Sequence, residues 1–326
     1  MTVVITSLSP FVAADPTALD PLKFRDRLVT AKGEARATVA LTGLDTLWFN
    51  TGTLCNIACL NCYIESSPKN DALAYLTAAE VEAYLDEIPA LGLKTREIGF
   101  TGGEPFMNRE IIAIIEAALQ RGFEALVLTN AMRPMRRFES QLLALRARHP
   151  DRLTLRISLD HPTAAVHDAE RGDGSFASTL DGLTWLAKHG FNLAVAGRHL
   201  PYEDEADARA AFQRLFDAHA IPVDAGDPGR LVLFPEMDVR VDVPEITTAC
   251  WGILNKSPSD VMCSTSRMVV KRRGAGQPVV LACTLVPYDP QFEMGATLGE
   301  ALGEVALNHP HCAKFCVLGG ASCSAR

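Results

Sequence analysis

The chain contains little that would direct it to a membrane or to nucleic acid. None of its apolar runs reaches the roughly 18–20 residues that a membrane-spanning helix needs. The first 19 residues lack a basic region followed by an apolar core and contain Pro10, Asp15 and Pro16, so we expect no signal peptide. The formal net charge of −8 argues against broad binding to nucleic acid or membrane surfaces. We therefore expect a cytoplasmic protein with no nucleic-acid partner and no membrane partner.

A fourth cysteine is missing beside the densest cysteine cluster. Cys55, Cys59 and Cys62 share one short segment, and the next cysteine is Cys250. In a reducing compartment nine cysteines, an odd number, indicate metal ligands rather than a disulfide framework. A cubane iron–sulfur cluster normally takes a thiolate on each iron, so three thiolates predict a [4Fe–4S] cluster with one iron open to a non-protein ligand. The alternatives are a zinc site, for which no fourth ligand is near, and three buried cysteines.

From Thr46 onward, strand-like and helix-like stretches alternate. We expect strands at 46–50, 96–100, 125–129, 153–159, 192–196 and 230–234, and helices at 77–91, 109–121, 141–148, 178–189 and 205–218. Thr77 and Glu80 are placed as the capping box of the first helix. Such alternation predicts βα units around a parallel sheet. About six units predict the α/β class and a partial (β/α)6 TIM-like barrel.

Polar motifs follow four of the expected strands. In barrels of this kind chemistry lies at the carboxyl ends of the strands. There the sequence places the cysteine loop, the Gly-Gly-Glu-Pro turn at 101–105, Thr129-Asn130, and the segment 158–160. Glycines let the backbone approach a ligand, and Glu104 could accept a hydrogen bond from an ammonium group. An ordinary strand-to-helix turn is the alternative for the Gly-Gly-Glu-Pro segment alone.

The C-terminal part differs in character from the barrel. Prolines at 235, 244 and 258 mark the change, and six of the nine cysteines follow residue 249: Cys250, Cys263, Cys283, Cys312, Cys316 and Cys323. We expect a β-hairpin with strands near 268–270 and 278–281, and a helix near 298–307. The predicted division is an N-terminal extension at 1–44, a cap or β-hairpin, then the barrel at 45–245 and a cysteine-rich domain at 246–326.

The cysteine loop after the first barrel strand and the Gly-Gly-Glu-Pro turn after the second together resemble the radical S-adenosylmethionine (SAM) superfamily. Ile157-Ser158-Leu159-Asp160, His167-Asp168 and the segment 171–176 resemble members that carry a C-terminal SPASM or twitch domain. The similarity covers roughly 46–200 well and 260–326 more loosely. One departure is Asn61, where the family often has an aromatic residue. This departure weakens a packing contact against the cofactor and leaves the three ligands intact.

The resemblance implies a role for each matching residue. Cys55, Cys59 and Cys62 would bind a [4Fe–4S] cluster whose open iron is chelated by SAM. Gly102, Gly103 and Glu104 would contact the methionine amino group, and Pro105 belongs to the same turn. Ser158 and Arg171 would reach the ribose or the carboxylate. Asp160, Thr129 and Asn130 complete the set of implied cofactor-binding residues. Reductive cleavage of SAM would give a 5′-deoxyadenosyl radical that removes hydrogen from a substrate. An external one-electron donor of flavodoxin or ferredoxin type is implied.

The later cysteines resemble those that hold auxiliary clusters in SPASM and twitch domains. Six are too few for two fully ligated cubanes, so we expect one auxiliary cluster drawn from Cys263, Cys283, Cys312, Cys316 and Cys323. Cys250 is the expected bystander, although it could act with Cys263. A structural zinc or free thiols are the alternatives. The sequence does not decide whether such a cluster relays an electron or binds substrate.

Several functions stay open within this interpretation. The substrate could be a peptide, a tetrapyrrole, as in the heme d1 pathway, or a small metabolite. Residues 1–44 are short for a peptide-binding domain, which lowers the peptide option. A relative of the molybdopterin-forming GTP cyclase ranks lower because the chain ends in 322–326 Ser-Cys-Ser-Ala-Arg and not in Gly-Gly. A non-catalytic iron–sulfur carrier or scaffold is the alternative from another class. A carrier has no need of a SAM pocket.

Other polar residues carry weaker expectations. Dispersed histidines are expected to be mostly structural or solvated: His161, His167, His199, His309 and His311. Glu236 and Asp238 follow the sixth strand and could face the substrate. Trp48 is expected to pack in the core. The catalytic acid or base is not assigned.

Overall fold

A nine-stranded sheet runs through the molecule. The computed structural model describes residues 9–12, 17–235 and 238–320. The strand order is β10-β9-β8-β2-β3-β4-β5-β6-β7. Its strands are β2 (Thr46–Asn50), β3 (Glu97–Thr101), β4 (Glu124–Thr129), β5 (Leu153–Ser158), β6 (Asn192–Gly197), β7 (Leu231–Leu233), β8 (Ser266–Val270), β9 (Val279–Leu281) and β10 (Glu293–Gly295). Neighbours from β2 to β7 pair in parallel, so the predicted six-stranded open barrel is confirmed.

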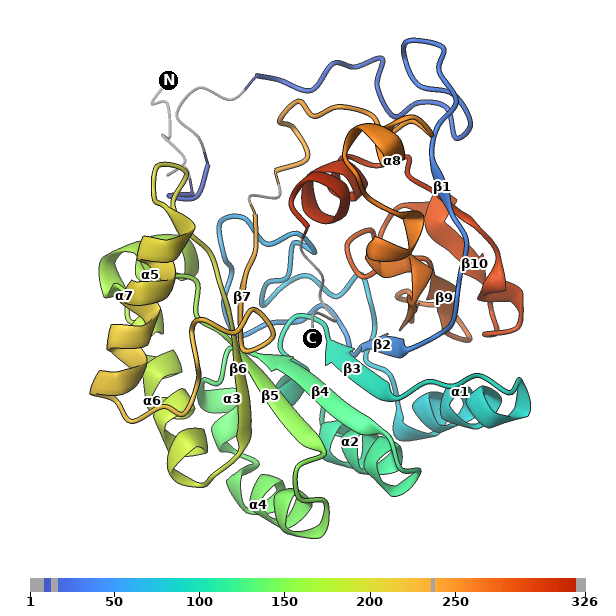
Figure 1. The fold of residues 1–326 in the computed structure, drawn as a ribbon. Helices are drawn as coiled ribbons and strands as arrows, with labels where there is room; N and C mark the ends of the chain where they lie inside the picture. Colours follow the sequence, from blue (N-terminus) through green and yellow to red (C-terminus); the bar gives the residue numbers. More distant parts are fainter. Residues whose placement is uncertain (1–8, 13–16, 236–237, 321–326) are drawn as a thin grey trace, which may run out of the picture.

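Helices cover the outer face of this sheet (Figure 1). The longer ones are α1 (Ala78–Ala90), α2 (Ile111–Gln120), α4 (Glu139–Arg148), α5 (Ala164–Arg171), α6 (Ser175–Lys188) and α7 (Glu205–Ala218), and the short ones are α3 (Arg133–Arg136) and α8 (Cys250–Ile253). Thr77 and Glu80 form the predicted capping box. The sequence pattern predicted every long helix except α5. Among the described residues, no helix is long and apolar enough to cross a membrane.

Strand β2 shows why the sheet is buried on both faces. Leu47 and Phe49 pack into the core beneath the helices, whereas Trp48 points into a second core on the other side. Trp48 lies opposite Gly99 in the parallel register, and a Cβ on Gly99 would lie 2.3 Å from the indole ring. Two-sided burial is expected of a parallel strand. The prediction that Trp48 packs in the core is confirmed.

The C-terminal part is built onto the edge of the barrel sheet. Strands β8 and β9 form the predicted hairpin, and β8 also pairs in parallel with β2. The N-terminal segment runs alongside this part in Figure 1, where β1 (Thr38–Val39) pairs with β11 (Val305–Ala306). Arg36 forms a buried ion pair with Glu245 at 2.5 Å. The division into three regions at 1–44, 45–245 and 246–326 stays a prediction.

The prediction of a helix at 298–307 is wrong. The segment instead contains one short turn, η5 (Glu300–Leu302), and then strand β11. Two of its carbonyl groups, those of Ala301 and Gly303, accept hydrogen bonds from Arg267 on β8. Tertiary pairing with Arg267 and with β1 therefore replaces the local helical pattern. Further on, η6 (Cys312–Leu318) is a π-helical segment.

Candidate functional site

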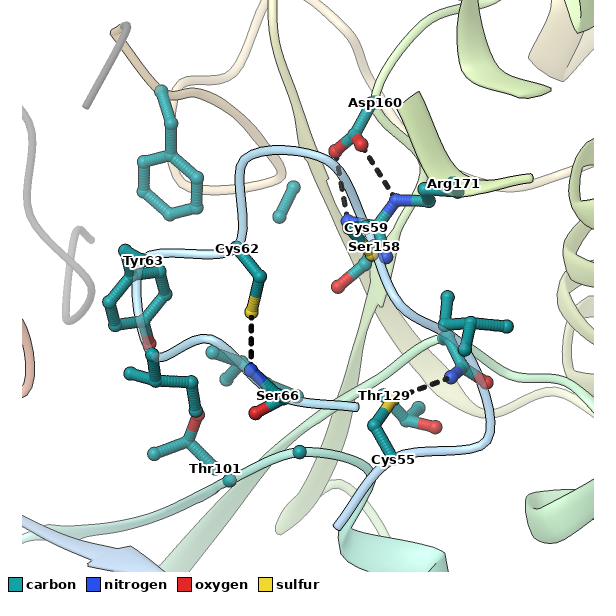
Figure 2. Close-up of a pocket in the computed structure, with 18 of the residues that line it drawn as sticks. Cys55, Cys59, Cys62, Tyr63, Ser66, Thr101, Thr129, Ser158, Asp160 and Arg171 are labelled. Carbon is teal, nitrogen blue, oxygen red and sulfur yellow. Dashed lines mark hydrogen bonds and ion pairs between the residues drawn. The ribbon is translucent and has the colours of Figure 1, made fainter. Parts of the chain in front are cut away.

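A cavity opens where the barrel strands end (Figure 2). Its empty space is about 1020 Å³, with the mouth onto solvent included. Successive strands each contribute lining residues at or just beyond their carboxyl ends. The residues predicted from the sequence that line the cavity are Cys55, Cys59, Cys62, Gly102, Gly103, Thr129, Asn130, Ser158, Asp160 and Arg171. The structure therefore gathers ten predicted site residues around one space.

The three cysteines lie on the loop between β2 and α1. The amide of Ser66 donates to Sγ of Cys62 at 3.4 Å, and the amide of Ile57 donates to Sγ of Cys55. Burial raises the pKa of Cys55 to about 12 and that of Cys59 to about 11, because a thiolate loses its hydration there. A bound cationic metal would be needed to keep these thiols ionised at neutral pH.

The donor set fits a cluster better than a single metal ion. No group of three His, Cys, Asp or Glu side chains among the described residues is close enough to hold one ion. A structural zinc ion normally takes four protein ligands, and this loop supplies three cysteines. The Ser66 hydroxyl also lines the cavity, is buried and has no hydrogen-bond partner in the structure. Such an orphaned polar group is expected where a ligand completes the site.

Glu170 of α5 anchors the cysteine loop from behind. Its carbonyl oxygen accepts from the amide of Leu60, and its Oε1 accepts from the amide of Asn61, both at 2.9 Å. The carboxylate is buried, and its Oε2 has no hydrogen-bond partner. No sequence pattern indicated this role, because α5 was not predicted. Glu170 therefore fixes the segment between Cys59 and Cys62.

Gly102 and Gly103 serve the packing of the cysteine loop. The amide of Gly103 donates to the carbonyl of Gly52 at 2.7 Å. A Cβ on Gly103 would lie 2.2 Å from the carbonyl oxygen of Leu54, and one on Gly102 would lie 2.5 Å from that of Gly52. Gly102 also has a φ of +149°. Both glycines therefore let the protein's own backbone approach closely, and both also line the cavity. Their contact with a cofactor stays a prediction.

Glu104 lies behind the cavity wall. Its carboxylate accepts hydrogen bonds from the Thr129 hydroxyl at 2.8 Å, the Asn130 amide at 2.9 Å and the Phe106 amide at 3.1 Å. Burial raises its pKa to about 7, and these donors act in the opposite direction. Glu104 thereby ties the end of β3 to the end of β4. Glu104 and Pro105, the first residue of η1 (Pro105–Met107), are not among the lining residues.

Asp160 and Arg171 form a bidentate ion pair in the cavity wall. Arg171 donates from Nε to Oδ2 at 2.7 Å and from a terminal nitrogen to Oδ1 at 2.9 Å (Figure 2). The guanidinium groups of Arg171 and of Arg198, which is 3.8 Å away, hold the pKa of Asp160 well below its usual range, against the effect of burial. Nδ1 of His167 accepts the Asp160 amide at 3.2 Å, and burial lowers the pKa of His167 to about 4. His167 is buried and holds the backbone of Asp160.

The other half of the cavity is apolar. Leu128, Ala196 and Phe234 come from the ends of strands β4, β6 and β7. Leu285 and Phe315 of the C-terminal part complete the apolar lining. The sequence did not predict any of these, because their contribution depends on how the C-terminal part is placed over the barrel. This wall offers apolar contact to a second molecule beside the polar half.

A second, smaller cavity lies within the C-terminal part. Its empty space is about 370 Å³, and its other lining residues are mainly apolar. The cysteines that line it are Cys263, Cys283, Cys312 and Cys316, and His311 lies beside them. Leu285 lines both cavities and therefore separates them. Four of the five cysteines expected to form an auxiliary site come together here.

The remaining predicted residues lie elsewhere. Cys250 does not line the second cavity; its sulfur accepts the Thr247 amide at 3.3 Å within a local turn. Asp238 is paired with Arg240 at 2.6 Å and does not line the first cavity. Cys323 and Glu236 lie outside the described residues. The ring of His309 is tilted by 54° against that of His311, with centroids 4.8 Å apart, and burial lowers the pKa of His309 to about 4.

The fold and its main cavity define a class of protein: an open (β/α) barrel with a three-cysteine loop at the carboxyl ends of its strands. Residues 49–215 match the family model described as the Radical SAM superfamily. The chain belongs to the radical SAM superfamily. The family predicted from the cysteine loop and the Gly-Gly-Glu-Pro turn is thereby confirmed.

Curated relatives match over part of the chain. The subtilosin biosynthesis protein AlbA of Bacillus subtilis (strain 168) is 35% identical over 143 residues, covering 44% of this chain and 30% of AlbA. The mycofactocin maturase MftC of Mycobacterium tuberculosis (strain ATCC 25618 / H37Rv) is 32% identical over 156 residues, covering 46% of this chain and 38% of MftC. The chain spans less than half the length of either relative.

Solved structures share the fold. Streptococcus suis SuiB bound to S-adenosylmethionine superimposes with a TM-score of 0.57 and 12% identity, over 78% of this chain and 64% of SuiB. The protein anSMEcpe with bound AdoMet gives a TM-score of 0.55 and 14% identity, over 78% of this chain and 79% of that chain. These likenesses confirm the predicted fold class, an α/β barrel with a cysteine-rich C-terminal region.

Proposed function

We propose that this protein reductively cleaves S-adenosylmethionine and uses the resulting radical to remove hydrogen from a peptide or small-molecule substrate. The observation that carries the proposal is the convergence, on one cavity, of three cysteines with the Asp160–Arg171 pair. A [4Fe–4S] cluster with bound SAM supplies the one-electron chemistry that generates the 5′-deoxyadenosyl radical. An electron carrier would need the cysteines but not the polar wall, so the carrier alternative is disfavoured.

The chain's own residues would divide the work at this site. Cys55, Cys59 and Cys62 would hold three irons of a [4Fe–4S] cluster and leave the fourth without a protein ligand. Arg171, fixed by Asp160, offers a cation to the carboxylate of SAM, and Ser158 at the end of β5 offers a hydroxyl. The apolar wall of the cavity would limit the access of water to a reactive intermediate. An external donor of flavodoxin or ferredoxin type supplies the electron.

The second cavity would hold one auxiliary [4Fe–4S] cluster. Cys263, Cys283, Cys312 and Cys316 line it, and four thiolates satisfy a cubane. Full ligation by these four leaves Cys323 outside the ligand set that we propose.

The substrate that we favour is a peptide. SuiB is also known in complex with its precursor peptide SuiA, at a TM-score of 0.57, and AlbA is named for bacteriocin biosynthesis. The apolar wall formed by Leu128, Phe234 and Phe315 would accept an uncharged side chain next to the polar half of the cavity. Tetrapyrroles and small metabolites stay as alternatives.

The decisive experiment measures SAM cleavage. The protein is reconstituted anaerobically with iron and sulfide, reduced with dithionite and given SAM, and 5′-deoxyadenosine is quantified by mass spectrometry. We expect formation of 5′-deoxyadenosine by the wild type and none by the Cys55→Ala/Cys59→Ala/Cys62→Ala variant. A fully reconstituted wild-type protein that binds no SAM and yields no 5′-deoxyadenosine would refute the enzyme proposal.

Iron counting tests the auxiliary cluster separately. The triple alanine variant should retain about four irons per chain if a second cubane is present. Adding Cys312→Ala to that variant should remove them. Retention of nearly no iron by the triple variant would refute the auxiliary cluster and leave the SAM proposal standing.

A further inference from the structure

Arg267 is a buried cation that has no carboxylate partner among the described residues. It lies on β8 with 1% of its surface exposed. Nε donates to the Ala301 carbonyl at 2.8 Å, and the terminal nitrogens donate to the carbonyls of Cys263 at 2.6 Å, Ser266 at 2.8 Å and Gly303 at 3.0 Å. All four acceptors are neutral backbone oxygens. Within the described part of the chain, no carboxylate lies within 4.0 Å of this guanidinium.

The nearby acidic residues do not provide the missing charge. Glu300 and Glu304 lie on the loop that Arg267 holds, and both are exposed. The carboxylate of Glu300 accepts hydrogen bonds from the amides of Ala296 and Thr297. Backbone carbonyls satisfy the hydrogen-bond donors of Arg267 but leave its net charge buried, and an uncompensated buried charge is strongly unfavourable.

Arg267 lies beside the second cavity. Its guanidinium donates a hydrogen bond to the carbonyl of Cys263 at 2.6 Å, and Cys263 lines that cavity together with Cys283. Neutral thiols carry no charge, whereas thiolates around an iron–sulfur cubane give the whole group a net negative charge.

We propose that Arg267 is the countercharge of an anionic iron–sulfur cluster in the second cavity and raises the reduction potential of that cluster. The proposal rests on the proposed auxiliary cluster. Reduction adds one electron and makes the cluster more negative, so a fixed cation nearby stabilises the reduced form more than the oxidised form. The effect is strong because the site is buried and poorly screened. Arg267 acts as a positioning and electrostatic residue and touches no substrate.

A redox titration followed by electron paramagnetic resonance tests this role. The parent is the Cys55→Ala/Cys59→Ala/Cys62→Ala variant, so that only the auxiliary cluster contributes signal. Arg267→Met and Arg267→Lys are made in this parent and compared at equal iron content. We expect a more negative potential in Arg267→Met and a smaller shift in Arg267→Lys, which keeps the charge. Arg272→Met is the matched control, because Arg272 follows the same strand but pairs with Glu293 at 3.0 Å; it should not shift the potential.

A second measurement covers the case in which Arg267→Met assembles little cluster. Thermal unfolding is compared between iron-loaded and iron-free protein, with and without the substitution. Loss of the cluster should destabilise the parent more than the Arg267→Met variant, because only the parent is left with an unpaired buried charge. Equal destabilisation, or an unchanged potential at full iron content, would overturn the role of Arg267 while leaving the cluster in place. If the parent variant holds no iron, both the auxiliary cluster and the role of Arg267 are overturned.

Discussion

A methyl group placed on Gly103 would lie 2.2 Å from the carbonyl oxygen of Leu54, the residue before Cys55. Backbone therefore meets backbone at this point, and neither side can yield by rotating a side chain. We expect Gly103→Ala to displace the cysteine loop and to lower both the iron content of the first cluster and the yield of 5′-deoxyadenosine by at least about tenfold, since a displacement of about 1 Å at a site can cost this much or more.

Gly276→Ala is the control for this substitution. A Cβ at Gly276 meets no atom within 4 Å, and the residue lies in the exposed hairpin turn. Its iron content and SAM cleavage should match those of the wild type. Normal iron content and activity in Gly103→Ala would show that the cysteine loop tolerates displacement.

Gly182 of α6 packs on the loop that follows β4. A Cβ there would lie 1.9 Å from the carbonyl oxygen of Ala131, a buried residue with a φ of +57°. Helix propensity alone favours Gly182→Ala by about 1 kcal/mol, whereas overpacking costs about 1–3 kcal/mol or more. We expect net destabilisation, seen as a lower urea midpoint with an unchanged m-value. Gly252→Ala in α8, where nothing lies within 4 Å, should be neutral or stabilising, and an unchanged midpoint in Gly182→Ala would contradict the clash.

The barrel could be predicted because its signals are local. Strand β2 and helix α7 have the predicted bounds to the residue, since alternation, caps and apolar periodicity all act over a few positions. Helix α5 was missed because its residues were interpreted only as a motif. The parallel pairing of β8 with β2 joins residues far apart in the sequence, and no local pattern encodes such a contact.

The residues of the candidate site likewise divide into those with a local sequence signal and those without one. The three cysteines, Asp160 and Arg171 could be predicted from spacing and resemblance because their chemistry is rare. Leu285 and Phe315 could not, because an apolar side chain becomes part of a pocket only through tertiary placement. Glu104 shows what a motif does not reveal: its carboxylate is held by Thr129 and Asn130 behind the wall, and its contact with the cofactor stays a prediction.

The two cysteines Cys312 and Cys250 should differ in their effect on iron content. Cys312 lines the second cavity, whereas Cys250 accepts a hydrogen bond from Thr247 within its own turn. In the wild-type background, Cys312→Ala should lower the iron count by up to about four per chain, and Cys250→Ala should leave it unchanged. Equal losses in the two variants would place Cys250 among the ligands. The absorbance of the reconstituted protein gives an independent measure of cluster content.

Glu104 makes the stability of the ligand-free protein depend on pH. Burial raises the pKa of its carboxyl to about 7, from an ordinary value of 4.5. Between these two values the folded protein retains a proton that the unfolded chain has released, so the free energy of unfolding falls as pH rises. This contribution to stability is fully present below about pH 4.5 and is lost by about pH 7, where Glu104 must ionise in the folded state as well.

Glu104→Gln should remove that slope. Glutamine does not titrate, and any change in its hydrogen bonds with Thr129 and Asn130 adds an offset that is nearly constant with pH. Urea unfolding of the iron-free protein from about pH 4.5 to about 7.5 should therefore show the stability of Glu104→Gln rising relative to that of the wild type and levelling above about pH 7. The exposed Glu304 provides the control, since Glu304→Gln should run parallel to the wild type. A constant difference between Glu104→Gln and wild type across this range would show that Glu104 is already ionised in the folded protein.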